Sequence, residues 1–266
     1  MYTDFSRVYD ALMQDVDYGA WAAHYGALMK LGGAPEKARV AECACGSGSI
    51  TLPLRRAGYA MTGLDLSEDM LEKAMEKARR AGLSIPFVCQ DMTRLQLPRR
   101  ADCILATCDG VNYLAQPGQP QAFFQAAYQN LKPGGLLIFD VSTPEKLKYT
   151  LGSNTLFSDE EEIAYIWQNS WDEEKQTVEM LLSIFEKEAD GRYVRLEEQQ
   201  LQRAHSRQEL TDWLAQAGFS EIAFYGGFRM DDPSPGMTAG ISLQKRHACK
   251  YTFRRAIRPP FSLIWT

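Results

Sequence analysis

Several classes of protein are excluded by what this sequence lacks. No apolar run approaches the ~18 residues that span a bilayer, and the N-terminus has neither the basic stretch nor the apolar core of a signal peptide. The six cysteines include no Cys-x-x-Cys pair, and the three histidines are scattered along the chain. We therefore expect a cytoplasmic protein with reduced thiols, without a metal site and without a membrane partner.

Acidic residues are absent from the last part of the chain. From Pro233 onward there are six Lys or Arg and no Asp or Glu, whereas the preceding body holds 23 basic and 34 acidic residues. An acidic body does not favour a nucleic-acid surface. The remaining composition, 45% hydrophobic and 24% charged, is typical of a globular chain.

Between residues 36 and 150, apolar strands alternate with helical stretches. The expected strands cover 39–45, 59–64, 86–89, 101–107 and 135–141, and the expected helices cover 50–57, 67–81 and 121–131. Nearly continuous apolar strands are typical of a parallel sheet with both faces covered. The sequence therefore predicts a doubly wound, mostly parallel α/β domain with a Rossmann-like fold.

Four further segments flank this core. Residues 1–35 are expected to be helical with a break near Tyr18-Gly19, and 151–205 to form an antiparallel insertion of three strands, 163–171, 177–188 and 193–203. A capping box at Ser206–Glu209 opens a return helix in 206–235, followed by a strand at 219–225. Residues 236–266 form an atypical basic tail in which Ile241–Leu243 is a poor strand candidate.

Several explanations of the basic tail stay open. It could dock on the acidic body or on a neighbouring subunit, form a solvated segment, or make a polybasic contact with RNA or a membrane. The abrupt change in composition also suggests an altered reading frame after Pro235.

The main candidate site is the glycine-rich turn in Val40–Ser49, which follows the first strand. Such a turn brings free backbone N–H groups to the carboxyl edge of a parallel sheet, where ligands bind. Asp65 ends the next strand, where its carboxylate can accept both hydroxyls of a ribose. A dinucleotide prefers Gly-x-Gly-x-x-Gly, but Thr51 replaces the third glycine and Glu42 would repel a pyrophosphate. S-adenosylmethionine, which carries an amino group and a sulfonium, fits better.

The stretch from Val40 to Val141 resembles a class I S-adenosylmethionine-dependent methyltransferase. The matching segments are Glu42–Gly48, with Ala44 in place of the commoner first glycine, then Gly63–Met70, Cys89–Met92 and Leu131–Gly135. The N-terminal segment and the antiparallel insertion are similar to those of glycine and amino-sugar N-methyltransferases. The resemblance implies S-adenosylmethionine as cofactor, S-adenosylhomocysteine as product, and a small molecule methylated at nitrogen or oxygen.

The resemblance also implies which residues form the site. The cofactor-binding residues would be Tyr9, Tyr18, Glu42, Ala44, Gly46, Gly48, Asp65, Leu66, Met70, Asp91, Met92 and Cys108, and Asp109, Asn112 and Tyr113 would face the acceptor. Asp65 would hold the ribose, Asp91 the adenine amine, and Glu42 the methionine amino group. Met70 and Tyr113 could equally be core residues, and Asn112 a turn residue. The insertion would roof the acceptor pocket or form a homodimer contact.

Three other functions stay open on the sequence alone. The chain could be a non-catalytic S-adenosylmethionine-binding sensor or partner subunit. It could methylate nucleic acid, although neither Asn-Pro-Pro-Tyr nor a catalytic Pro-Cys follows the fourth strand and the body is acidic. A dinucleotide oxidoreductase is the third alternative, and it would differ in the cofactor that it binds.

Overall fold

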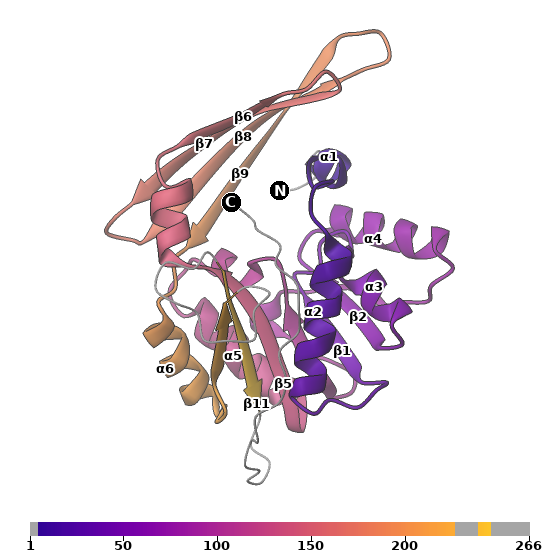
Figure 1. The fold of residues 1–266 in the computed structure, drawn as a ribbon, viewed down its shortest axis with the longest axis vertical. Coiled ribbons are helices and arrows are strands. Elements are labelled where there is room, and N and C mark those ends of the chain that lie inside the picture. The colour runs from indigo at the N-terminus through magenta and orange to yellow at the C-terminus, as the bar shows by residue number, and fades with distance from the viewer. Residues whose placement is uncertain (1–4, 227–238, 246–266) are drawn as a thin grey trace.

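A seven-stranded sheet forms the centre of the molecule (Figure 1). The computed structural model describes residues 5–226 and 239–245. The strand order is β10-β11-β5-β4-β1-β2-β3, where β1 is Arg39–Cys43, β2 Ala60–Asp65, β3 Phe87–Cys89, β4 Ala101–Ala106, β5 Leu131–Ser142, β10 Ala223–Gly226 and β11 Ala239–Lys245. Strands β1 to β5 are parallel, and β11 is antiparallel to both β5 and β10. The doubly wound α/β prediction is confirmed.

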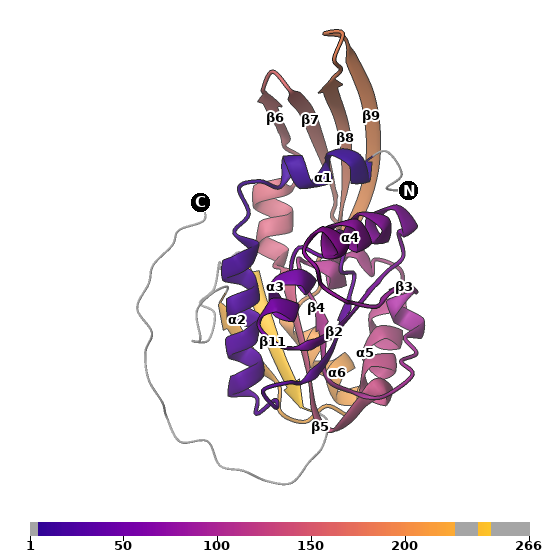
Figure 2. The same ribbon diagram turned by 90° about the vertical axis from the view of Figure 1, so that its right-hand side faces the viewer.

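Helices cover both faces of this sheet (Figure 2). The helices are α1 Phe5–Leu12, α2 Tyr18–Leu31, α3 Thr51–Arg56, α4 Glu68–Arg80, α5 Gln119–Asn130 and α6 Arg207–Ala217, with short helical segments η1 Met92–Arg94, η2 Gly110–Tyr113 and η3 Lys146–Leu151. Val40 and Met61 point toward α2 and α3, whereas Ala41 and Ile104 point toward α5 and α6. This alternation builds two apolar layers. Within the described residues, no helix has the length and apolar character needed to cross a membrane.

Local signals in the sequence set the helix ends. The side chain of Ser67 caps α4 by accepting the N–H of Met70, and Ser206 and Glu209 form the predicted capping box of α6. Gly218 ends α6 with a φ of 105°. The N-terminal segment breaks at 13–17, directly before the predicted position at Tyr18-Gly19, because Asp17 accepts the N–H of Ala20 and so starts α2 at residue 18.

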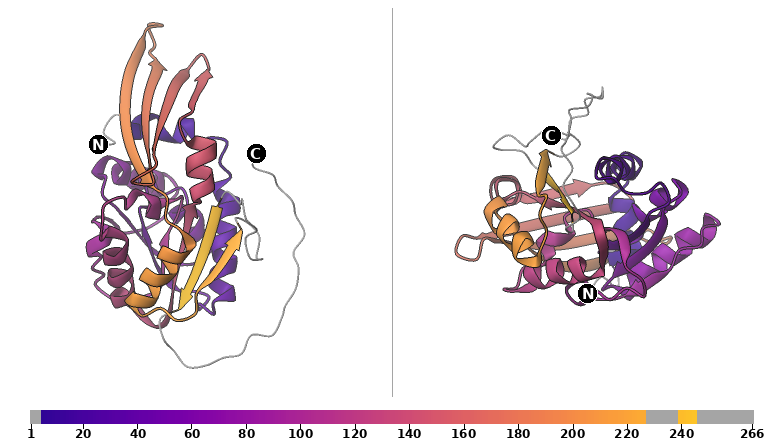
Figure 3. Two further views of the ribbon diagram at one scale, coloured as in Figure 1. Left: turned by 90° about the vertical axis from the view of Figure 1, so that its left-hand side faces the viewer. Right: turned by 90° about the horizontal axis from the view of Figure 1, so that it is seen from below.

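A second, antiparallel sheet rises from the carboxyl edge of the parallel strands (Figures 1 and 3). Its order is β6-β7-β8-β9, with β6 Thr155–Asp159, β7 Ile163–Asp172, β8 Thr177–Lys187 and β9 Tyr193–Arg203. Three of these strands were predicted and β6 was missed, since four of its five residues are exposed and give no apolar pattern. Helix α1 lies between this sheet and α4. Homodimer formation through this sheet stays a prediction.

The strand that completes the central sheet lies in residues that the sequence pattern did not predict as a strand. The prediction that Ile241–Leu243 is a poor strand was wrong, because 239–245 forms β11 between β5 and β10. Two neighbouring ladders stabilise a strand whose own alternation is weak. A strand that closes the sheet is therefore present at 239–245, and the altered reading frame after Pro235 stays a hypothesis that sequencing of the parent DNA would test. The rest of the basic tail, 236–238 and 246–266, lies outside the described residues.

Candidate active site

Asp65 connects two of the loops at the carboxyl edge of the parallel sheet. Its Oδ2 accepts the N–H of Gly46 at 2.8 Å, and its Oδ1 accepts the N–H of Ser67 at 2.9 Å. Burial raises the pKa of Asp65, and the backbone N–H groups that bond to it oppose that rise. The carboxylate thus fixes the glycine turn and the start of α4, and it has further lone pairs for a ligand.

The glycine turn itself has a left-handed backbone. Ala44, Gly46 and Gly48 have φ values of 53°, 51° and 77°. A Cβ on Gly48 would lie 2.9 Å from Cδ1 of Leu52, whereas no atom of the described chain lies within 4 Å of a Cβ placed on Gly46. Gly48 is therefore needed for packing, and Gly46 borders open space.

Glu42 lies beneath this turn and is almost fully buried. Its carboxylate accepts the hydroxyls of Thr51 at 2.5 Å and Thr107 at 2.8 Å. Burial raises its pKa to about 7, against the lowering effect of the two hydroxyls. Glu42 therefore ties β1 to α3 and to the end of β4, and it brings a carboxyl group under the turn.

The predicted adenine-side residues occupy the ends of β2 and β3. Asp91 accepts the N–H and the hydroxyl of Thr93 on the same oxygen, Oδ1, at 2.8 Å each. Met92 is half-buried against the core, and Leu66 is 66% exposed. Met70, by contrast, is buried in a cluster with α1 and the antiparallel sheet, which is the packing role left open above.

A turn after β4 carries the predicted acceptor-side residues. Cys108 and Asp109 have φ values of 54° and 52° although neither is glycine, a conformation that costs free energy and is often found at functional sites. Asp109 accepts the hydroxyl of Ser142 at 3.1 Å and a hydrogen bond from the side chain of Gln202 on β9. Burial raises its pKa.

Asn112 and Tyr113 have different surroundings. Both N–H groups of the Asn112 amide are used, by the carbonyls of Ser142 at 3.1 Å and Arg203 at 2.9 Å, and its oxygen accepts the N–H of Ser142. Asn112 therefore joins β5 to β9 and has no donor left for an acceptor molecule, so its predicted catalytic role gives way to a structural one. Tyr113 is 37% exposed and donates to Gln200 on β9 at 2.9 Å.

Two tyrosines lie near this turn. The hydroxyls of Tyr9 and Tyr18 interact with one another, and both lie within electrostatic range of Cys108. Burial raises the pKa of Tyr18 to about 12 and that of Tyr9 further, so both stay neutral phenols.

Five described cysteines are free thiols. In residues 5–226 and 239–245, His, Cys, Asp and Glu form no group that could hold a metal ion.

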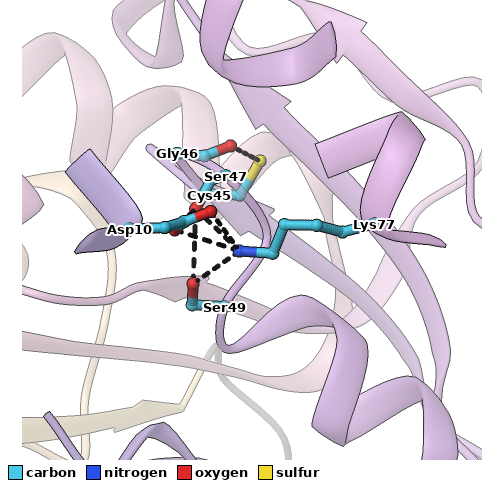
Figure 4. Close-up of polar contacts among 6 residues, drawn as sticks. All are labelled: Asp10, Cys45, Gly46, Ser47, Ser49 and Lys77. Atoms are coloured by element: carbon cyan, nitrogen blue, oxygen red, sulfur yellow. Dashed lines mark hydrogen bonds and ion pairs between the residues drawn. The ribbon is translucent and has the colours of Figure 1, made fainter. Parts of the chain in front are cut away.

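Helix α1 is fastened to the glycine turn by a polar network (Figure 4). The Lys77 amino group of α4 lies 3.0 Å from Asp10 Oδ2, 3.0 Å from the Ser47 hydroxyl and 3.1 Å from the Ser49 hydroxyl. Ser47 in turn donates to Asp10 at 2.7 Å. Since α1 also packs Val8 against the antiparallel sheet, it connects that sheet with the glycine turn.

We expect Lys77→Met to loosen α1 without unfolding the core. The partly exposed network should contribute about 1 kcal/mol, so amide exchange in residues 5–12 should accelerate about fivefold. Lys73→Met on the same helix is the control, because it removes the same charge but makes no ion pair among the described residues. Equal exchange in both variants, measured by mass spectrometry, would contradict the role of the network.

Sequence reasoning missed Asp140, Tyr25, Lys77 and Gln202. Asp140 had a signal, because it is the one charged residue in the apolar run 136–141. It accepts the hydroxyl of Tyr25 and the N–H of Asp109, and burial raises its pKa to about 6. His205 is buried and contacts the Arg203 side chain and the carbonyl of Val111, which gives it a structural role.

The chain is similar to known methyltransferases over most of its length. Residues 40–135 match the family model of the methyltransferase domain. A protein of Geobacillus sp. (strain WCH70) that has a provisional methyltransferase name is 33% identical over 233 residues, which cover 88% of this chain and 94% of that protein.

Solved structures agree with this assignment. A S-adenosylmethionine-dependent methyltransferase from Clostridium acetobutylicum ATCC 824 has a TM-score of 0.84 at 27% identity, and the match covers 93% of this chain and 99% of the other. CalS10 with bound S-adenosylmethionine, an amino pentose methyltransferase from Micromonospora echinaspora, shares the fold with a TM-score of 0.71 at 22% identity, over 90% and 97% of the two chains. This chain belongs to the S-adenosylmethionine-dependent methyltransferases, and its cofactor is S-adenosylmethionine.

Proposed function

We propose that the enzyme methylates a nitrogen or oxygen atom of a small-molecule acceptor. The observation that carries this proposal is the turn after β4. Cys108 lies within electrostatic range of Tyr9 and Tyr18, and Asp109 contacts Ser142 on β5 and Gln202 on β9. A cofactor bound at the glycine turn and an acceptor bound under the antiparallel sheet would meet at this turn. The amino pentose named for CalS10 is a small molecule, which supports the same class of acceptor.

The residues on the cofactor side fit S-adenosylmethionine. Gly46 borders open space, so the backbone can approach the methionine portion, and the Asp65 carboxylate beside it has lone pairs for the ribose hydroxyls. Leu66 exposes an apolar side chain on which an adenine ring can lie. Asp91 uses only Oδ1 in its bonds to Thr93, so Oδ2 can accept the adenine amine. Ala44 and Met92 complete the proposed surface, and the buried Glu42 and Gly48 hold the turn in place behind it.

On the acceptor side, Asp109 is the proposed catalytic residue. The cofactor supplies an electrophilic methyl group on a sulfonium, whose charge is lost in the transfer. Asp109 can take the proton from the acceptor nitrogen or oxygen, and burial raises its pKa, which makes the carboxylate a stronger base. The side chains around the turn contribute by holding the nucleophile about 3 Å from the methyl carbon and in line with the bond between that carbon and sulfur.

The proposal is tested by identifying which molecule receives the methyl group. Incubation of the protein and tritiated S-adenosylmethionine with a fractionated cell extract should label the small-molecule fraction, with the label on nitrogen or oxygen by mass spectrometry. Asp109→Asn should lower this labelling about 100-fold, because a positioned acid–base group contributes at least that much. Label in the RNA or protein fraction, or on carbon, would contradict the proposal.

A further inference from the structure

A buried carboxylate lies directly behind the turn at 107–109. Asp140, near the end of β5, is 5% exposed, and its Oδ2 accepts the N–H of Asp109 at 2.7 Å. The N–H of Cys108 also donates to it. Its Oδ1 accepts the hydroxyl of Tyr25, which is fully buried on α2, at 2.5 Å. Two consecutive backbone N–H groups and one phenol therefore converge on a single carboxylate.

The backbone that Asp140 holds is strained. Cys108 and Asp109 are consecutive non-glycine residues with positive φ, and such a conformation persists only where the surroundings fix it. Successive N–H groups in this geometry form a concave site for an anion. Here a side chain of the protein is that anion, so the carboxylate is well placed to fix the turn.

Both residues of this turn lie among groups of the candidate site. Tyr9 lies within electrostatic range of both Cys108 and Asp109, and Asp109 also contacts Ser142 and Gln202. We propose that Asp140 and Tyr25 are positioning residues that hold the turn in its left-handed form, and thereby set where the methyl donor and the acceptor meet. The proposal rests on the proposed function of the site, and both residues act through the turn.

A matched control separates this role from simple burial of a polar group. Asp102 also lies in the sheet, at the start of β4, and accepts the N–H of Arg39 at 2.8 Å and the amino group of Lys132 at 2.6 Å. It is therefore a carboxylate with two partners at the opposite edge of the same sheet. Asp102→Ala should lower the melting temperature without changing the turn.

The first measurement is hydrogen exchange of the ligand-free protein. In Asp140→Ala the amides of Cys108 and Asp109 lose their acceptor, and we expect their exchange to accelerate at least about tenfold. Asp102→Ala should leave these two amides unchanged. Equal exchange in Asp140→Ala and the wild type would overturn the proposal.

The second measurement is the affinity for S-adenosylhomocysteine by calorimetry. Asp140→Ala should weaken binding about tenfold, whereas Asp140→Asn should stay within about threefold of the wild type. The asparagine oxygen can still accept the backbone N–H groups while its amino group faces the Tyr25 hydroxyl. Unchanged affinity in Asp140→Ala, or no rescue by asparagine, would contradict a positioning role.

Tyr25→Phe keeps the test decisive if Asp140→Ala does not fold. It removes one hydroxyl and retains the buried ring, and we expect about threefold faster exchange at Cys108 and Asp109. Unchanged exchange in Tyr25→Phe would then overturn the proposal. A wild-type protein that labels only RNA or protein would contradict the proposed function instead, whatever the exchange at the turn.

Discussion

Asp65→Asn is expected to weaken S-adenosylmethionine binding about 100-fold. The wild-type carboxylate accepts two backbone N–H groups and is placed to accept two ribose hydroxyls. Asparagine has the same size but no charge and one acceptor oxygen, so at least one of these bonds is lost. Hydrogen bonds to charged groups contribute about 1.5–3 kcal/mol each, which corresponds to the expected change. Calorimetry with S-adenosylmethionine, S-adenosylhomocysteine and NAD measures it.

A second substitution on the neighbouring helix controls for the change in charge. Glu72 is exposed on α4, so Glu72→Gln removes one negative charge without touching the glycine turn. It should bind S-adenosylmethionine like the wild type. If Asp65→Asn lowers the melting temperature and leaves the affinity intact, Asp65 only fixes the turn and the ribose assignment is wrong. NAD binding would contradict the cofactor fit.

The parallel sheet could be predicted because its signals are local. Apolar runs, the serine caps of α4 and α6 and the glycine turn each depend on residues close together in the sequence. Strands β6 and β11 could not be predicted in this way. Most of β6 is exposed, and β11 is defined by the strands on its two sides.

The cofactor side of the site was easier to predict than the acceptor side for a related reason. Asp65 and the glycine turn belong to short motifs, whereas the contacts around Asp109 join distant segments. Tyr25 and Asp140 are 115 positions apart, and Gln202 comes from the antiparallel sheet. Asn112 shows the reverse error, because its position after β4 indicated the acceptor while its amide is used by β5 and β9. Whether such a residue faces the acceptor or holds two strands together depends on contacts between segments that are distant in the sequence.

The two glycines of the turn should separate folding from binding. Gly48→Ala would place a Cβ 2.9 Å from Leu52 Cδ1 and 3.2 Å from the Cβ of Ala74, at a φ of 77°. A left-handed alanine costs about 1–2 kcal/mol, and overpacking adds about 1–3 kcal/mol. We therefore expect the melting temperature of Gly48→Ala to fall by roughly 10 °C, measured by calorimetric or spectroscopic unfolding.

Gly46→Ala should weaken cofactor binding more than it lowers stability. Its φ of 51° is close to that of Ala44, which already has a Cβ in this turn, and the added methyl meets no atom of the described chain within 4 Å. The melting temperature should fall by only about 3 °C. The methyl would instead enter the space assigned to the cofactor, so affinity for S-adenosylmethionine should drop at least about tenfold. If Gly46→Ala binds normally, the cofactor does not approach this backbone; if both variants lose only stability, the glycines are there to form the turn.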